Sequence, residues 1–450
     1  MTVTRDKGFY RNFFSLWSVL VLNNVIVLSV NLADNVMLGN YSEAALSGAA
    51  TCNQLQFVFS QLLVGLGGGA VILGSQYWGQ GRTDRVKRVG SWAILCSFAV
   101  AAVFFLAAAL VPEGLLRLFT DSPEIVEEGV RYLRVIKYSY PVFALTTMLL
   151  QILRSVESVK IGFYVSLAAL AVNIALNYCL IFGKMGFPVL GAEGAALATL
   201  IARVVELLVV VGYLFFFEKR LCFRLRDVWN NDTGLLRGYF RLSLPIMITD
   251  GLFGVSTALQ TVILGHMTDA AISANSVATT LYQLLKVASV GSAGAAAVII
   301  GKTIGEGRED KTREYAKTMQ IIFLFVGLLT GVTLFFLRAP IISLYRITEE
   351  AKTLADEFLL VLCVAGMGMA YQMPTNTGIV RGGGDAKYVL RLDLISIWGI
   401  VLPLSALAAF VWGLPPVAVI ACLNADQVFK CIPAVIKVNR FRWIKKLTEQ

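Results

Sequence analysis

The chain is dominated by long apolar stretches that alternate with short polar segments, and this alternation predicts its elements. Each apolar stretch is about as long as the roughly 20 residues that an α-helix needs to cross a bilayer. We predict twelve such helices, at approximately residues 13–38, 46–76, 90–111, 130–152, 162–183, 191–217, 240–265, 272–301, 317–337, 353–379, 387–412 and 415–436. The pattern therefore indicates an all-α polytopic membrane protein.

The first half of the sequence resembles the second half. When the sequence is aligned with itself so that Val36 meets Val262, residues 36–84 match the second half without a gap, and the stretch Gly79–Asp84 meets Gly305–Asp310. After a one-residue slip, Arg154 meets Arg381. The duplication predicts two parallel six-helix repeats, which form two lobes around a central cavity. We assign residues 1–217 to the N-terminal lobe, 218–239 to a basic cytoplasmic linker, and 240–450 to the C-terminal lobe with its short basic tail.

Composition and charge support the membrane class. The chain is 57% hydrophobic and 15% charged, against about 45–50% and about 25% in soluble domains, which excludes an ordinary soluble enzyme or a disordered tail. The net charge is +10. We expect 28 Lys and Arg residues on the side of the termini and 8 on the other side, so both termini are predicted in the cytoplasm and the protein in the plasma membrane. The seven scattered cysteines are interpreted as buried apolar residues rather than disulfides or metal ligands.

Several motifs resemble those of the multidrug and toxic-compound extrusion (MATE) family. They are Asp34…Val36-Met37-Leu38-Gly39, Gln76-Tyr77-Trp78-Gly79-Gln80-Gly81, Asn173-Ile174-Ala175-Leu176-Asn177-Tyr178, Gly183…Gly186-Phe187-Pro188 with the following Gly191-to-Thr199 stretch, and Arg381-Gly382-Gly383-Gly384-Asp385. The resemblance runs through essentially the whole chain in order. It implies a V-shaped bundle of two lobes that exports amphipathic, often cationic compounds by alternating access, driven by an H⁺ or Na⁺ gradient.

Asp34 is the first candidate for chemistry. An ionised carboxylate deep in an apolar helix costs roughly 2.5–3.5 kcal/mol, so it requires a partner, a bound cation or a proton. The MATE resemblance implies that Asp34, Asn173, Asn177 and Thr199 form the ion-coupling site of the N-terminal lobe. Such an all-oxygen set suits a proton network or a hard cation such as Na⁺. The alternative is structural: Asp34 caps a helix, and the asparagines join helices by hydrogen bonds.

The C-terminal lobe has charged residues within its predicted helices, namely Asp250, Lys286 and Asp393. Because intramembrane groups of opposite sign tend to pair, we predict a charge network with one surplus negative charge, which a proton or a cationic substrate would neutralise. A purely structural ion pair is the alternative. Phe253 and Ala370 stand where one branch of the MATE family has carboxylates, and this difference favours H⁺ over Na⁺ as the coupling ion.

Other residues are candidates for the wall of a substrate cavity. Flexible thioethers, an aromatic ring and amides suit a surface that binds varied hydrophobic ligands, although packing is the plainer interpretation. These candidates are Met367, Met369, Tyr371, Met373, Gln54, Gln56, Gln61 and Gln283.

The predicted function is secondary active export of amphipathic, cationic drugs or toxins in exchange for H⁺ or Na⁺. A flippase for lipid-linked saccharides, from the same wider superfamily, is the alternative. Enzymatic activity is not expected, because His266 is the sole histidine and no nucleophile–base pair or metal set lies at membrane depth. We expect no cofactor beyond the coupling ion and no nucleic-acid partner. The expected partners are small hydrophobic or cationic molecules and the lipid bilayer, and the protein is expected to be a monomer.

Overall fold

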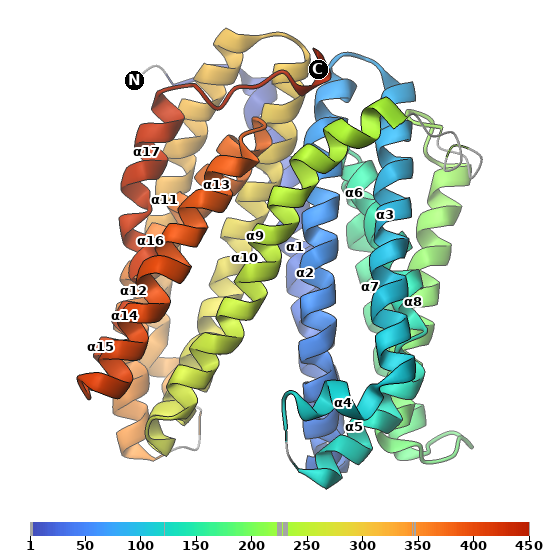
Figure 1. The fold of residues 1–450 in the computed structure, drawn as a ribbon, viewed down its shortest axis with the longest axis vertical. Helices are drawn as coiled ribbons and strands as arrows, with labels where there is room; N and C mark the ends of the chain where they lie inside the picture. The colour runs from blue at the N-terminus through green and yellow to red at the C-terminus, as the bar shows by residue number, and fades with distance from the viewer. Residues whose placement is uncertain are drawn as a thin grey trace. The chain divides into compact units, whose positions relative to one another are not determined.

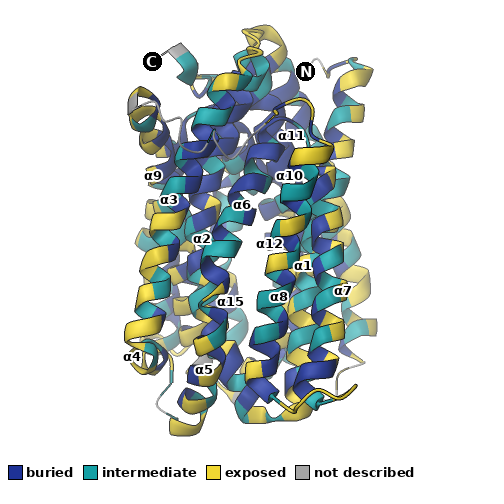
Figure 2. Cartoon of the chain, turned by 90° about the vertical axis from the view of Figure 1, so that its right-hand side faces the viewer, coloured by how far each residue is buried: buried dark blue, intermediate teal, exposed yellow. Residues whose placement is uncertain are grey.

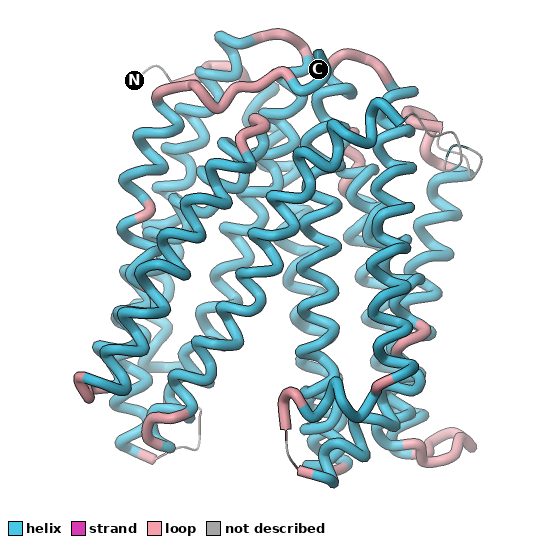
Figure 3. The backbone as a smooth tube through the Cα atoms, viewed as in Figure 1, coloured by secondary structure: helices cyan, strands magenta, loops and turns pink. Residues whose placement is uncertain are grey.

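The described part of the chain is helical. The computed structural model describes residues 3–120, 122–222, 227, 233–343, 345 and 348–449. These residues form helices joined by short loops, and no strand occurs among them (Figure 3).

The helices of the first half are α1 (Lys7–Tyr41), α2 (Glu43–Gly79), α3 (Thr83–Leu110), α4 (Pro112–Arg117), α5 (Pro123–Ile136), α6 (Ser139–Ser155), α7 (Lys160–Phe182) and α8 (Gly191–Phe216). Those of the second half are α9 (Thr233–Gly265), α10 (Asp269–Gly305), α11 (Glu309–Ile342), α12 (Glu349–Met373), η2 (Pro374–Val380), α13 (Ala386–Asp393), η3 (Leu394–Val401), α14 (Leu402–Ala406), η4 (Leu407–Val411), α15 (Pro416–Leu423), α16 (Ala425–Phe429), α17 (Cys431–Asn439) and η5 (Leu447–Glu449) (Figure 1).

The long helices match the apolar stretches of the sequence. Among the described residues, ten helical segments are long and apolar enough to cross a membrane, and a bent pair, Pro416–Leu423 with Ala425–Asn439, makes eleven. The predicted single helix over 130–152 is instead the end of α5 followed by α6, because α5 is amphipathic and only α6 is largely apolar. Of the predicted linker, residues 223–226 and 228–232 lie outside the described residues, and α9 already begins at Thr233.

The helix limits repeat along the chain in the same way as the sequence. The alignment that pairs Gly79 with Gly305 also pairs Glu43 with Asp269, so α2 and α10 begin and end at equivalent positions of the repeat. A glycine with positive φ follows each helix, Gly81 at 72° and Gly307 at 74°. Only glycine adopts such angles without steric cost. The duplication is therefore present in the backbone as well as in the sequence.

Exposed residues occur along several of the long helices (Figure 2), and many of them are large and apolar. On α3, Val103 and Leu106 are 64% and 53% exposed, and on α11 Phe325 and Leu329 are 69% and 67% exposed. Long apolar faces of this kind are stable when they contact hydrocarbon rather than water, and a helix satisfies its own backbone hydrogen bonds there. The chain is therefore an integral membrane protein.

The chain divides into two compact units. One comprises Met1–Val21, Ser75–Gln80 and Gly251–Gln450, and we call it the C-terminal unit; the other, the N-terminal unit, comprises Leu22–Gly74 and Gly81–Asp250. In the N-terminal unit, α7 packs on α8, α3 packs on α6, and α5 and α6 also contact α8. In the C-terminal unit, α12 packs between α10 and α11, and its Phe358 and Leu362 belong to a buried apolar cluster.

Both ends of the described chain lie at one end of the C-terminal unit (Figure 1). The Thr4 backbone N–H donates to Thr318 Oγ1 at 3.0 Å. In the tail, Trp443 is fully buried against Gly383. The buried Gln76 side chain donates to the Lys445 carbonyl at 3.0 Å. Its Oε1 accepts a hydrogen bond from the Leu447 backbone N–H at 2.9 Å. The tail is thus fixed to the last turn of α2 and to the loop before α13.

Asp385, in that loop, makes this attachment sensitive to acid. Its carboxylate is 2.7 Å from Lys437 Nζ and 2.8 Å from Lys445 Nζ. Burial by itself would raise the pKa of Asp385, but hydrogen bonds from Lys437 and Lys445 outweigh it and hold this pKa below its ordinary value. A carboxyl whose pKa is lowered by folding stabilises the fold above its unfolded pKa, near 3.9, and loses that stabilisation as the pH falls through the folded pKa.

We therefore expect Asp385→Asn to lower the free energy of unfolding by about 1–3 kcal/mol at neutral pH, the range for a hydrogen bond to a charged group. The gap between wild type and variant should narrow below about pH 4. Thermal unfolding of the detergent-purified wild type and variant from pH 7 to pH 3 measures this difference in stability. Asp84→Asn, which changes a carboxylate that is 64% exposed, is the matched control. A gap that stays constant over this range would contradict the role given to the Asp385 charge.

Candidate ion-coupling site

The four residues predicted for the ion-coupling site meet within the N-terminal unit. Asp34 lies late in α1, Asn173 and Asn177 lie one turn apart on α7, and Thr199 lies on α8. Asn177 Nδ2 donates to an Asp34 carboxylate oxygen and to Asn173 Oδ1, the latter at 3.1 Å. Asn173 Nδ2 in turn donates to Thr199 Oγ1 at 3.3 Å. A continuous chain of polar contacts therefore links α1, α7 and α8.

The two asparagines are buried while the carboxylate is only partly covered. Asn173 and Asn177 are 1% and 0% exposed, and Asn177 Oδ1 has no hydrogen-bond partner in the structure. The oxygen and nitrogen of an amide are assigned from the hydrogen-bond network. An amide flip that exchanges Oδ1 and Nδ2 of Asn177 would therefore present its oxygen to a protonated Asp34. The same site can satisfy the carboxylate in its ionised form and in its neutral form.

Two further side chains, Arg203 and Tyr132, interact electrostatically with the Asp34 carboxylate. Arg203 on α8 is close enough to interact electrostatically with Asp34, and its guanidinium pairs with Glu206 at 2.8 Å and lies over the Phe143 ring at 4.5 Å. The Tyr132 hydroxyl lies beside Thr199. Tyr132 was not among the candidates chosen from the sequence, since it lies at the start of the stretch predicted as a spanning helix over 130–152. The single tyrosine of α5, at a buried position, is the signal that was available.

Within the C-terminal unit, Asp393 and Lys286 of the predicted charge network contact different residues. Asp393 forms its ion pair with Lys430, at 2.8 Å, and Lys430 also contacts Asp426 at 2.9 Å. The Lys286 ammonium lies over the Phe253 ring at 4.9 Å, and Asp250 is part of the N-terminal unit. Asp393 thus pairs with Lys430, which directly follows α16, since η3, the element after Asp393, lies against α16.

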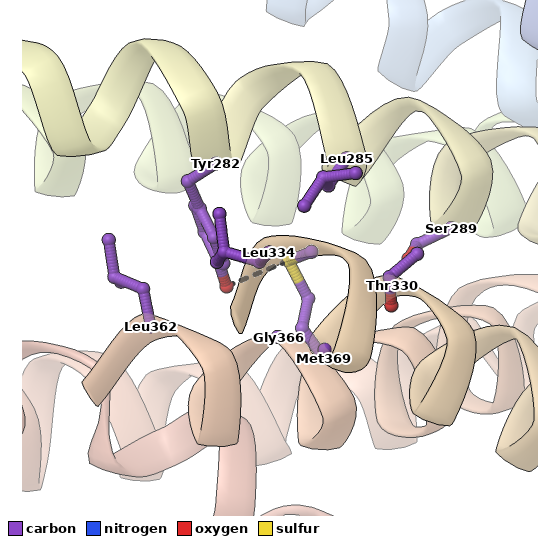
Figure 4. Close-up of a pocket in the computed structure, with 9 residues that line it drawn as sticks. Tyr282, Leu285, Ser289, Thr330, Leu334, Leu362, Gly366 and Met369 are labelled. Carbon is purple, nitrogen blue, oxygen red and sulfur yellow. Dashed lines mark hydrogen bonds between the residues drawn. The ribbon is translucent and has the colours of Figure 1, made fainter. Parts of the chain in front are cut away.

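One pocket lies within the C-terminal unit, between α10, α11 and α12 (Figure 4). It is lined by Tyr282, Leu285, Ser289, Thr330, Gly331, Leu334, Leu362, Gly366 and Met369. The Tyr282 hydroxyl donates to Met369 Sδ at 3.2 Å, across the pocket (Figure 4). Of the residues proposed from the sequence as cavity lining, Met369 is the one found in this pocket.

The other proposed lining residues lie elsewhere. Tyr371 is buried and donates to Gln320 Oε1 at 2.8 Å, and Met367 contacts Gly331 on α11. Met373 is half-buried, as are Gln56 and Gln61, whereas Gln54 and Gln283 are exposed. Among the described residues, no group of three or more His, Cys, Asp or Glu side chains is arranged to hold a metal ion.

Two repeats of apolar helices, with a carboxylate–amide network inside one of them, define a polytopic membrane protein. Comparison with known proteins agrees with this class. The family model described as MatE matches residues 20–179 and 245–407, more than half of the chain. The chain therefore belongs to the MatE family of transporters.

The relatives are similar over nearly their whole length. The chain is 27% identical over 413 residues to "Probable multidrug resistance protein NorM" of Halalkalibacterium halodurans, covering 90% of this chain and 88% of that protein. It is 24% identical to "Uncharacterized transporter YisQ" of Bacillus subtilis, covering 98% and 96%. The crystal structure of the Vibrio cholerae MATE transporter VcmN in the bent form has a TM-score of 0.85 at 18% identity and covers 98% of both chains, which shows a shared fold.

Proposed function

We propose that the protein is a secondary active multidrug exporter that exchanges amphipathic, cationic compounds for protons, with Asp34 as the proton carrier. The observation that carries this proposal is the chain of contacts from Asp34 through Asn177 and Asn173 to Thr199. The name of the NorM relative, a multidrug resistance protein, supports export of drug-like molecules.

The proposed mechanism follows from the charge of Asp34. The ionised carboxylate attracts a cationic substrate and accepts the Asn177 N–H. Protonation of Asp34 removes a negative charge that is costly at membrane depth. The neutral carboxyl group then needs the Asn177 amide oxygen as an acceptor, whereas the ionised carboxylate needs the amide N–H as a donor. Because Asp34, Asn177 and Thr199 stand on three different helices, the proton changes contacts between helices rather than within one. Substrate and proton then favour different arrangements of α1, α7 and α8, as alternating access requires.

The remaining features of the proposal concern topology. Both termini lie in the cytoplasm of a plasma membrane protein, in agreement with the 28 to 8 distribution of Lys and Arg. The lobes are residues 1–217 and 240–450, joined by the basic linker 218–239. The protein acts as a monomer and needs no cofactor other than the coupling ion.

Transport in everted membrane vesicles tests this function. We expect an imposed pH gradient to drive export of a cationic dye such as ethidium, and a Na⁺ gradient alone to drive none. Export driven by Na⁺ alone would overturn proton coupling while leaving efflux intact. If neither gradient moves the dye but a lipid-linked saccharide crosses the membrane, the flippase function replaces the proposal.

A further inference from the structure

A buried ammonium lies between two carboxylates in the C-terminal unit. Lys430 Nζ is 2.8 Å from Asp393 Oδ1 and 2.9 Å from Asp426 Oδ2. The side chains of Lys430 and Asp426 are 3% and 4% exposed, and that of Asp393 is 25% exposed. Asp426 lies on α16 and Lys430 directly follows that helix, one turn later, whereas Asp393 ends α13. The two carboxylates therefore surround one positive charge from two different helices.

Neutral side chains continue this cluster into the interior. Gln427 Nε2 donates to Asp426 Oδ1 at 2.9 Å, Gln372 Nε2 donates to Gln427 Oε1 at 2.9 Å, and Asn376 Nδ2 donates to Gln372 Oε1 at 3.2 Å. The buried Asn376 Oδ1 has no hydrogen-bond partner in the structure. Like the site around Asp34, this cluster is thus a carboxylate backed by a chain of amides.

The internal repeat makes this cluster the sequence equivalent of part of the ion-coupling site. The alignment that pairs Arg154 with Arg381 also pairs Gly186 with Gly413 and Pro188 with Pro415. Both of the latter glycines have positive φ, 85° and 57°. The equivalence therefore holds in conformation as well as in sequence at the entry to the sixth helix of each repeat.

The same alignment pairs Thr199 with Asp426 and Arg203 with Lys430. Each half thus has a basic residue four positions after an oxygen-bearing residue on its sixth helix. In the N-terminal unit the cation of Arg203 is neutralised by Glu206 on its own helix. In the C-terminal unit the cation of Lys430 lies between the carboxylates themselves.

We propose that Asp393 and Asp426 form a monovalent-cation site in the C-terminal half and that the ammonium of Lys430 permanently occupies it. The ligand class of the site, once Lys430 is removed, is a small monovalent cation such as an alkylammonium ion or Na⁺. Among the described residues, Lys286 and the Tyr282 hydroxyl, both on α10, interact electrostatically with Asp426. Because the ammonium of Lys430 is covalently part of the chain, the carboxylates of Asp393 and Asp426 are neutralised without a cation from solution.

Removal of the tethered cation tests this inference. Lys430→Ala leaves two carboxylates and a space the size of an alkylammonium ion. We expect the thermal unfolding midpoint of the detergent-purified variant to be lowest in N-methylglucamine chloride. It should rise saturably when methylammonium or Na⁺ replaces that bulky cation at constant ionic strength. The wild-type midpoint should be the same in all three salts.

Control variants separate occupancy of the site from general salt effects. Lys437→Ala removes a lysine on α17, seven residues after Lys430. Its partner Asp385 keeps Lys445, so this variant should show no cation selectivity. Asp426→Asn combined with Lys430→Gln keeps the hydrogen-bonding groups but lacks the charges, and should also be insensitive. If Lys430→Ala does not accumulate, Lys430→Gln is measured in the same salts.

Two results would overturn the proposal. One is an equal midpoint of the Lys430 variant in N-methylglucamine, Na⁺ and methylammonium salts. The other is the same selectivity in the charge-free double variant. The proposal extends the transport function proposed above, but this measurement follows folding alone. An unfolding result that contradicts the cation site would therefore not contradict proton coupling at Asp34. Likewise, an absence of dye export would not contradict the cation site.

Discussion

Asp34→Asn is expected to reduce dye export driven by a pH gradient to the level of vesicles that lack the protein. Asparagine has nearly the shape of aspartate, and its amide oxygen can still accept the Asn177 N–H that the carboxylate accepts. It has no ionisable proton and no charge at any relevant pH. The substitution therefore removes proton exchange and attraction of a cation while leaving the hydrogen bonds between α1 and α7 in place.

The measurement compares initial rates of ethidium export, normalised to the amount of protein in the membrane. Asp84→Asn, at the exposed start of α3, is the matched control and should export at the wild-type rate. The unfolding midpoint of Asp34→Asn should be equal to or above that of the wild type, because an ionised carboxylate is costly at this depth. Full export by a well-folded Asp34→Asn variant would overturn the coupling role of this residue.

The sequence predicted the helices and the repeat because both depend on local composition. Apolar stretches of the right length specify spanning helices, and the glycines that end α2 and α10 recur at equivalent positions of the two halves. Helix boundaries were harder to predict where a helix is amphipathic. The last residues of α5 and the residues of α6 resemble one continuous apolar stretch in the sequence, but in the structure they belong to two separate helices.

The N-terminal site was predictable because its four residues match motifs of a known family. The pairing in the C-terminal unit was not, since hydropathy does not determine which helices of a bundle face each other. Asp393 could have met Lys286 or Lys430, and only the contact of η3, which follows Asp393, with α16 decides for Lys430.

The crossing of α2 and α10 depends on two glycines at equivalent positions of the repeat. Within the C-terminal unit, a Cβ atom added to Gly79 would overlap the Lys302 carbonyl oxygen, and one added to Gly305 would overlap the Gln76 carbonyl oxygen. Both obstacles are backbone atoms of the opposite helix, which cannot move aside as a flexible side chain could. The absence of side chains allows the two helices to approach this closely, as small residues do in membrane bundles.

We therefore expect Gly79→Ala and Gly305→Ala each to destabilise the protein by about 2–4 kcal/mol, at or above the usual cost of overpacking. The higher helix propensity of alanine offsets only about 1 kcal/mol of this. The double variant should cost less than the sum, because one separation of the helices relieves both overlaps. Denaturant unfolding in detergent measures all three variants. The control is Gly212→Ala on α8, where an added Cβ meets no atom within 4 Å; it should be neutral or stabilising. Costs for Gly79→Ala and Gly305→Ala no larger than that of Gly212→Ala would show that the close approach of α2 and α10 does not hold this end of the unit together.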